Sequence, residues 1–146
     1  MATPVGPAAG PHTQLAQNIV LGWLAGARVF ELKTIQVLDE LDIARPCIDM
    51  ETIGFNIEWS QELRVHESLE EYVKAWMMIE ILRRWEPLEP YLGEDPGPHL
   101  FDMSVGYDLE GIRSPKVAGF IDSMHDASAE IDRLRSAIPD GFAEFR

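Results

Sequence analysis

Hydrophobic and polar positions along the chain follow two periods in turn, one typical of helices and the other of strands. Apolar residues recur at helical spacing in three segments: residues 15–24, 69–84 and 115–124. Two shorter segments, residues 28–36 and 99–105, are rich in residue types that favour strands. In the first of these, the alternation sets Phe30 and Leu32 opposite Val29, Glu31 and Lys33, and so predicts two different strand faces.

Residues with strong positional preferences predict where the helices begin and end. Gly26 stands where the first helix should stop. Ser68 followed by Glu71 forms a capping box, so we expect the second helix to run from about residue 69 to residue 84. Ser114 and Pro115 are typical of a helix start and predict the third helix.

The segments between these elements differ in length and composition. Residues 39–67 follow no clear period, which indicates a long excursion rather than a minimal connection. Residues 86–98 contain four prolines and two glycines, so we expect an internal surface linker there. The whole pattern predicts a parallel α/β architecture of βα units with right-handed crossovers, as a single domain over residues 1–146.

Residues 3–11 form a run rich in Gly, Ala and Pro, which we interpret as the end of a first strand. Around Gly6 and Gly10, such small residues leave backbone amides open to a flat or phosphorylated ligand. Lys33 adds a positive charge at the end of the next strand, and parallel βα units place these ends at one edge. Two alternatives remain, a plain N-terminal loop and a lysine exposed to water.

Charge and composition narrow the class of protein. Of 146 residues, 46% are hydrophobic and 25% charged, which suits one globular domain. The net charge of -13 would repel nucleic acid, so we expect no nucleic-acid partner. The single cysteine, Cys47, cannot form an internal disulfide, and no apolar run reaches the length of a membrane span. We therefore expect a cytoplasmic protein without a membrane partner.

The histidines and the cysteine predict no metal site and no nucleophile. His12, His66, His99 and His125 show neither His-x-x-x-His nor His-Glu-x-x-His spacing. Cys47 has no histidine near it in the sequence, so a packed, inert thiol is the favoured interpretation over a catalytic one.

The chain resembles the flavin-binding barrels of the dihydroorotate and dihydropyrimidine dehydrogenase family. Within that family it is most similar to the N-terminal barrel of large enzymes that carry the labels selenate reductase or glutamate-synthase-like oxidoreductase. The resemblance lies in residues 3–13, 30–36, 46–49, 55–56, 58–59 and 101–112. It implies the first part of a TIM (β/α)8 barrel that binds FMN.

The resemblance also implies a flavin site. In the family, a Gly/Ala turn after the first strand lies against the flavin ring, a role that falls on Ala8, Ala9 and Gly10 here. Lys33 matches the catalytic lysine that contacts the flavin near N1 and O2. An ammonium there would stabilise the negative charge of the reduced ring.

Further positions follow from the same resemblance. Thr34, Ser104 and Gly106 match residues that line the cofactor in the family. The segment Gly54, Phe55 and Asn56 is similar to the loop that covers the substrate, although its surroundings depart from the common Asn-Ser-Met-Gly pattern.

The length of the chain implies an incomplete barrel. A complete barrel takes about 250 residues and eight strands, and we expect only three or four units here. We therefore expect a fragment that is inactive alone and whose partners are the remaining barrel strands or other electron-transfer modules. NADPH, FAD and iron-sulfur clusters belong only to downstream modules of the larger relatives, since one cysteine cannot hold a cluster.

Two functions follow as expectations. The first is the N-terminal part of an FMN-dependent oxidoreductase that transfers a hydride between flavin and a small heterocyclic substrate. The alternative is a stand-alone binding or oligomerisation module derived from the front of the barrel. In that case the open strand edges would be covered by a partner or by a second copy of the chain, as a homo-oligomer.

Overall fold

A computed structural model gives the structure of the chain and describes residues 4–35, 37, 48–49, 55–56, 63–93, 96–105 and 108–146. The first half contains η1 (Pro11–Thr13), α1 (Ala16–Leu24), β1 (Val29–Leu32), β2 (Ile48–Asp49), β3 (Phe55–Asn56) and α2 (Val65–Arg84). The second half contains η2 (Glu86–Leu88), α3 (Glu89–Leu92), β4 (Leu100–Met103), α4 (Leu109–Ile112), α5 (Pro115–His125), α6 (Ser128–Leu134), η3 (Arg135–Ala137) and η4 (Asp140–Phe145).

The central sheet consists of β1 and β4, which run parallel. Their register pairs Val29 with Leu100 and Glu31 with Asp102. Helix α2 lies between the two strands in sequence, so β1, α2 and β4 form the parallel βα unit that the alternation of periods predicted. A second, antiparallel pair joins β2 to β3.

The N-terminal segment runs beside β1 but forms only half a ladder. The backbone N–H groups of Arg28 and Glu31 donate to the carbonyl oxygens of Val5 and Pro7, at 2.9 and 3.2 Å. Pro7 has no N–H to return a bond, and the N–H of Ala9 donates instead to the Glu31 carboxylate at 3.1 Å. The predicted first strand is therefore an extended segment that runs parallel to β1 but does not form a regular strand.

Both helices of the first two units cover the same face of the sheet. Phe30, fully buried, lies beneath Gly22 of α1, where an added Cβ would stand 3.2 Å from its ring. Phe101 of β4 packs edge-on against Trp76 of α2, with ring centroids 5.1 Å apart. Because Phe30 and Phe101 are register partners, α1 and α2 lie on one side. A barrel has this arrangement, whereas a doubly wound sheet has helices on both sides.

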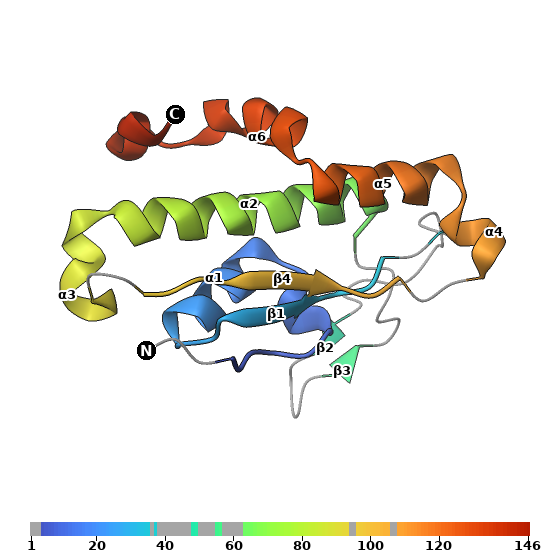
Figure 1. Cartoon of the computed structure of the whole chain (residues 1–146), viewed down its shortest axis with the longest axis horizontal. Coiled ribbons are helices and arrows are strands. Elements are labelled where there is room, and N and C mark those ends of the chain that lie inside the picture. The colour runs from blue at the N-terminus through green and yellow to red at the C-terminus, as the bar shows by residue number, and fades with distance from the viewer. Residues whose placement is uncertain are drawn as a thin grey trace.

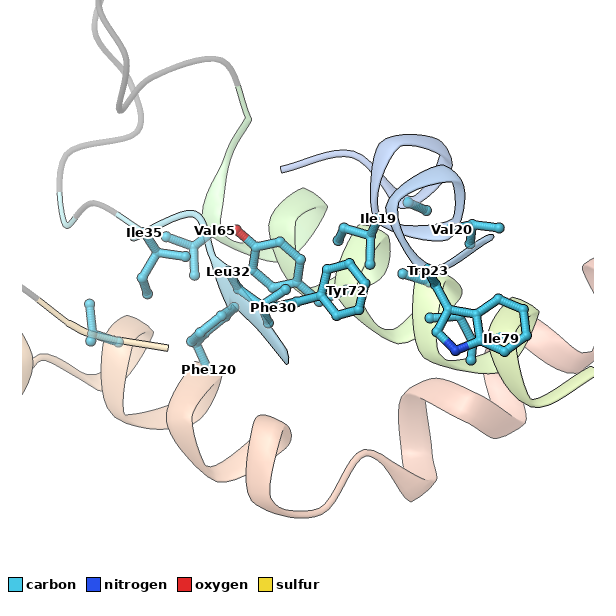
Figure 2. Close-up of a cluster of buried hydrophobic side chains, with 13 residues drawn as sticks. Ile19, Val20, Trp23, Phe30, Leu32, Ile35, Val65, Tyr72, Ile79 and Phe120 are labelled. Carbon is cyan, nitrogen blue, oxygen red and sulfur yellow. The ribbon is translucent and has the colours of Figure 1, made fainter. Parts of the chain in front are cut away.

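The core lies between the sheet and these helices, as Figure 2 shows. The predicted alternation of β1 is confirmed, because Phe30 and Leu32 are both fully buried. The principal members of the cluster are Ile19, Val20, Trp23, Phe30, Leu32, Ile35, Val65, Tyr72, Ile79, Val117 and Phe120.

Helix α2 begins one turn earlier than the capping box predicted. Its first residue is Val65, and the Glu67 carboxylate accepts the backbone N–H of Arg64 at 2.7 Å. Ser68, expected to cap the helix, is 4% exposed inside it. Glu71, expected to close the box, accepts the N–H of Ala16 at 2.7 Å and thus caps α1 across 55 residues. The capping box prediction is wrong because burial of Val65 and the Glu67 bond extend the helix backward.

Other predicted boundaries are confirmed. Gly26 follows α1 with φ of 108°, a conformation that favours glycine. Helix α2 ends at Arg84. Ser114 caps α5 by accepting the N–H of Val117 at 3.4 Å, with Pro115 as the first helical residue.

The expected surface linker over residues 86–98 has more structure than its composition predicted. It contains η2 and α3, and its last part is held against the fold, because Pro96 and Gly97 are buried. The carbonyl oxygen of Pro96 accepts a hydrogen bond from the buried Arg28. The short helix α4, capped by Asp108, was not predicted from the sequence.

The tail forms a further layer on the outside of α2. Figure 1 shows α6 and the C-terminal turns, in red, along the side of α2 that faces away from the sheet. Arg133 of α6 pairs with Glu70 of α2 at 2.7 Å, an ion pair between the two helices. Among the residues that the structure describes, no helix is both long and apolar enough to cross a membrane.

Candidate functional site

The carboxyl ends of the strands gather most of the predicted cofactor residues. Lys33 and Thr34 follow β1 directly, and Ser104 follows β4. The turn at residues 8–10 lies beside the same end of β1, because Ala9 is hydrogen-bonded to Glu31 two residues before Lys33. The structure thus brings the N-terminal turn and the lysine to one edge, as parallel βα units predict.

Lys33 is buried rather than exposed to water. It is only 1% exposed, and its ammonium donates to the carbonyl oxygen of Thr34 at 3.3 Å. The alternative of a solvated lysine at a strand end is therefore wrong. A buried ammonium loses much of its hydration, so this position concentrates positive charge in an environment of low dielectric constant.

Hydrogen bonds join the N-terminal turn to the end of β1. The N–H of Gly10 donates to the Thr13 hydroxyl, which in turn donates to the Gly10 carbonyl, both at 3.1 Å. The carbonyl of Thr13 accepts the N–H of Lys33 at 3.4 Å. The amides of Ala9 and Gly10, which the sequence suggested were open to a ligand, are both occupied by side chains. Gly10 is buried, and an added Cβ there would stand 2.8 Å from the His12 ring, so the turn offers a ligand only the surface of Ala8 and part of Ala9.

One buried polar atom beside this turn has no partner among the described residues. Gln14 is 2% exposed, and its Oε1 accepts no hydrogen bond. A buried acceptor left without a donor is uncommon and costly. Gln14 follows directly after Thr13 in the sequence. Its Oε1 is therefore one acceptor near the turn that could receive a bond from a further donor group.

The sheet face opposite the helices, which we call the inner face, carries Val29 and Glu31 of β1 with Leu100 and Asp102 of β4. Glu31 and Asp102 are register partners, so two carboxylates stand side by side on adjacent strands. Asp102 is exposed and Glu31 is partly buried. The inner face is therefore acidic at its middle level and apolar at the level of Val29 and Leu100, and Leu100 is 56% exposed.

The structure does not describe the side chains of the remaining predicted site residues, so it does not place them at this edge. Gly54 and Gly106 lie outside the described residues. Phe55 and Asn56 form β3, which pairs with β2, and the placement of their side chains is not described. Cys47 also lies outside the described residues.

A second buried cation, Arg28, lies at the opposite end of β1. Its guanidinium donates to the carbonyls of Trp23, Ala27 and Pro96 at 2.9, 2.7 and 2.8 Å, and stacks on the Trp23 ring. Burial lowers the pKa of Arg28. Sequence analysis did not single it out, since nothing distinguishes a buried Arg from a surface one without its partners. A cavity of about 600 Å³ borders this end, lined by Gly26, Arg28 and Tyr91 among others.

His99 precedes β4 near that same end. Its side chain is 2% exposed and lies between the rings of Trp76 and Phe101, with centroids 4.2 and 5.8 Å away. Burial lowers the pKa of His99. Within the described residues, no three His, Cys, Asp or Glu side chains lie close enough together to hold a metal ion.

Comparisons with known proteins agree on one family. The family model described as oxidoreductase YgfK, N-terminal TIM-barrel domain, matches residues 1–139. "Putative oxidoreductase YgfK" of Escherichia coli strain K12 is 53% identical over 128 residues, and its namesake from Escherichia coli O157:H7 shows the same identity. The match covers 87% of this chain but only 12% of either relative. No solved structure matches the chain.

Proposed function

This chain belongs to the family of the N-terminal TIM-barrel domain of the oxidoreductase YgfK, and we propose that it supplies the front of an FMN-dependent oxidoreductase barrel. In this proposal the barrel transfers a hydride between FMN and a small heterocyclic substrate. The family establishes a barrel domain of an oxidoreductase, and the small parallel sheet agrees with an incomplete α/β barrel. The flavin, the substrate class and the direction of transfer are parts of the proposal.

The observation that carries the proposal is the position of Lys33. It is buried at the carboxyl end of β1, on the edge where barrels place their reacting groups, and the turn at residues 8–10 reaches the same edge. A buried ammonium at this edge would stabilise negative charge on a reduced ring more strongly than an exposed one. FMN, when bound, supplies the hydride chemistry itself.

Part of this edge fits a flat ring. Ala8, which is exposed, and Ala9 have side chains small enough to let a ring approach the backbone, whereas Gly10 is buried against the His12 ring, which would have to move aside. Gln14 Oε1 lacks a donor among the described residues and lies next to the turn, so a ring N–H is the kind of group it would accept. Thr34 and Ser104 would border the ring at the ends of the two strands.

The proposed partners follow from the short coverage of the relatives. Because the chain spans 12% of their length, the activity of the whole protein is a proposal. We expect the remaining barrel strands to complete the FMN site and further electron-transfer modules to supply NADPH, FAD and iron-sulfur clusters. The chain alone should then bind FMN weakly and turn over no substrate.

The test is FMN titration, followed by quenching of flavin fluorescence, on the chain and on a Lys33→Ala variant. The proposal expects saturable quenching that weakens by about tenfold in the variant, because one charge-assisted contact is lost. A matched Lys116→Ala variant, with an exposed lysine on α5, should bind like the original chain. Equal affinity in all three proteins would contradict the role of Lys33, and an absence of saturable quenching in the original chain would contradict an FMN surface on this part of the barrel.

One observation favours the alternative, a binding or oligomerisation module. Leu100 is 56% exposed on the inner face, and among the described strands β4 pairs only with β1, so one strand edge is open. Size-exclusion chromatography with light scattering tests this alternative. A stable homo-oligomer that a Leu100→Glu substitution dissociates would support it, and a monomer at high protein concentration would contradict it.

A further inference from the structure

We propose that Tyr72 is a positioning residue that fixes the backbone of Lys33, and through it the place of the ammonium at the candidate site. The Tyr72 hydroxyl donates to the carbonyl oxygen of Lys33 at 2.5 Å across 39 residues of chain.

The backbone of Lys33 needs such a partner because the strand ladder stops before it. The parallel pairing of β1 with β4 ends at Leu32 and Met103, so the peptide groups of Lys33 lie beyond the ladder. Its N–H donates to Thr13, and its carbonyl accepts from Tyr72. A buried residue with an unpaired carbonyl would be costly, so both bonds define where the chain leaves the strand.

The hydroxyl of Tyr72 lies at a position where packing alone asks for none. Tyr72 is 1% exposed and packs edge-on against Phe120, in a cluster otherwise made of apolar side chains. Figure 2 shows its ring in this cluster, with the red hydroxyl oxygen on the side of Ile35 and Val65. Phenylalanine would fill the same space, so the hydroxyl is explained by the polar chain that it completes. Burial raises the pKa of Tyr72, which keeps it protonated as a donor.

The inference deepens the proposed function, since it rests on Lys33 as the charged group of the site. The chain of bonds runs from α2 through Tyr72 to the end of β1, and reaches the N-terminal turn through Thr13. It ties the lysine and the turn to a rigid helix. Sites held in this way by a supporting layer keep their geometry, whereas loosely held groups lose it.

The test measures the reactivity of Lys33 directly, without a ligand. The chain has three lysines, Lys33, Lys74 and Lys116, so acetylation by sulfo-NHS-acetate followed by peptide mass spectrometry gives one rate for each. Tyr72→Phe should raise the rate at Lys33 by about tenfold and leave the rate at Lys116 unchanged, because one buried hydrogen bond is lost. Tyr72→Met, which also lacks the hydroxyl and fits irregular core space, should raise it likewise and serves as the second variant if Tyr72→Phe does not fold.

A matched control separates positioning from general stability. Ile79→Val removes one methyl group from another fully buried residue of α2. It should lower stability without changing the rate at Lys33. Equal rates at Lys33 in the original chain and in Tyr72→Phe, or equal increases in Tyr72→Phe and Ile79→Val, would overturn the proposal.

FMN titration of the same proteins distinguishes this inference from the proposed function. If the original chain binds FMN, Tyr72→Phe should weaken binding and Ile79→Val should not. If the original chain does not bind FMN, the proposed function fails, while the acetylation rates still decide whether Tyr72 positions Lys33.

Discussion

The two ends of β1 each carry a buried cation, and the two cations are held in different ways. Arg28, before the strand, is 6% exposed and donates to three backbone carbonyls from α1, its C-terminal turn and the segment before β4. Lys33, after the strand, is 1% exposed and donates from its ammonium to the adjacent Thr34 carbonyl. The first cation ties distant segments together, and the second donates to the residue that follows it in the chain.

This difference matches the division of labour in TIM barrels. The amino-terminal face of the strands in such folds serves stability, and the carboxyl-terminal face carries the chemistry. Arg28 lies on the first face and Lys33 on the second. Substitutions at the amino end should therefore cost folding free energy, and substitutions at the carboxyl end should change ligand binding or reactivity with little cost in stability.

The largest expected effect is at Arg28. Arg28→Met keeps an apolar stem over Trp23 but leaves the carbonyls of Trp23, Ala27 and Pro96 without their donor. We expect the free energy of unfolding to fall by about 3 kcal/mol, as for other buried charged groups whose partners are left unpaired. Urea denaturation measures it, and the exposed Arg135→Met is a matched control with little expected change. A smaller loss of unfolding free energy in Arg28→Met than in Lys33→Met would contradict the comparison.

A smaller loss is expected at Gly6, which lies against the amino end of β1. A Cβ there would stand 1.5 Å from the carbonyl oxygen of Val29, so the N-terminal segment must shift to admit a methyl group. We expect Gly6→Ala to lower the free energy of unfolding by about 2 kcal/mol. Gly119→Ala on α5, where an added Cβ meets nothing within 4 Å, should leave stability unchanged or raise it. Thermal denaturation of both variants tests the pair.

The next effect depends on pH and involves His99, also near the amino end. Burial is the largest cause that lowers its pKa; the charges of Arg83 and Arg28 lower it further, and Glu80 opposes them. Below about pH 6.5 the unfolded chain takes up a proton that the folded chain does not. The free energy of unfolding should therefore decrease as the pH is lowered.

Replacing His99 tests the sign of this dependence. His99→Phe keeps a ring between Trp76 and Phe101 and should flatten the decline of stability between pH 7 and pH 5. His125→Gln, at an exposed residue at the end of α5, should leave the decline as it is. A decline that is as steep in His99→Phe as in the original chain would rule out His99 as its source.

The smallest effect on stability is expected at Lys33. Lys33→Met keeps the length of the side chain and removes a buried ammonium, whose lost hydration offsets much of what its contacts contribute. We expect a change within about 1 kcal/mol, together with FMN binding weaker by about tenfold. Denaturation and titration of one sample measure both. A loss of stability as large as in Arg28→Met would mean that both ends of β1 serve folding alike.

Sequence patterns predicted the parts of the fold whose signals are local. The alternation of Phe30 and Leu32, the stop at Gly26 and the cap at Ser114 depend on neighbours within one turn or one strand, and all three are confirmed. The start of α2 was wrong because Ser68 and Glu71 fit a local rule, while Ser68 lies buried inside the helix and Glu71 accepts the N–H of Ala16.

The sequence predicted one part of the candidate site, and contacts between distant segments determine the rest. The gathering of residues 8–10 and Lys33 at one edge follows from parallel topology alone. The burial of Lys33 and the occupied amides of Ala9 and Gly10 depend on side chains that contact them across the fold, so no local pattern could reveal them. Their role toward a flavin remains a prediction.

The Glu71 carboxylate that closes the first turn of α1 also has a consequence for the order of folding. The amide of Ala16 finds its acceptor 55 residues later in the chain, on α2. The first turn of helix α1 therefore has no acceptor of its own for this N–H group. That group becomes protected from hydrogen exchange only when α2 docks. We expect hydrogen exchange at Ala16 to slow together with the middle of α2, so that two helices separated by the whole excursion form as one cooperative unit.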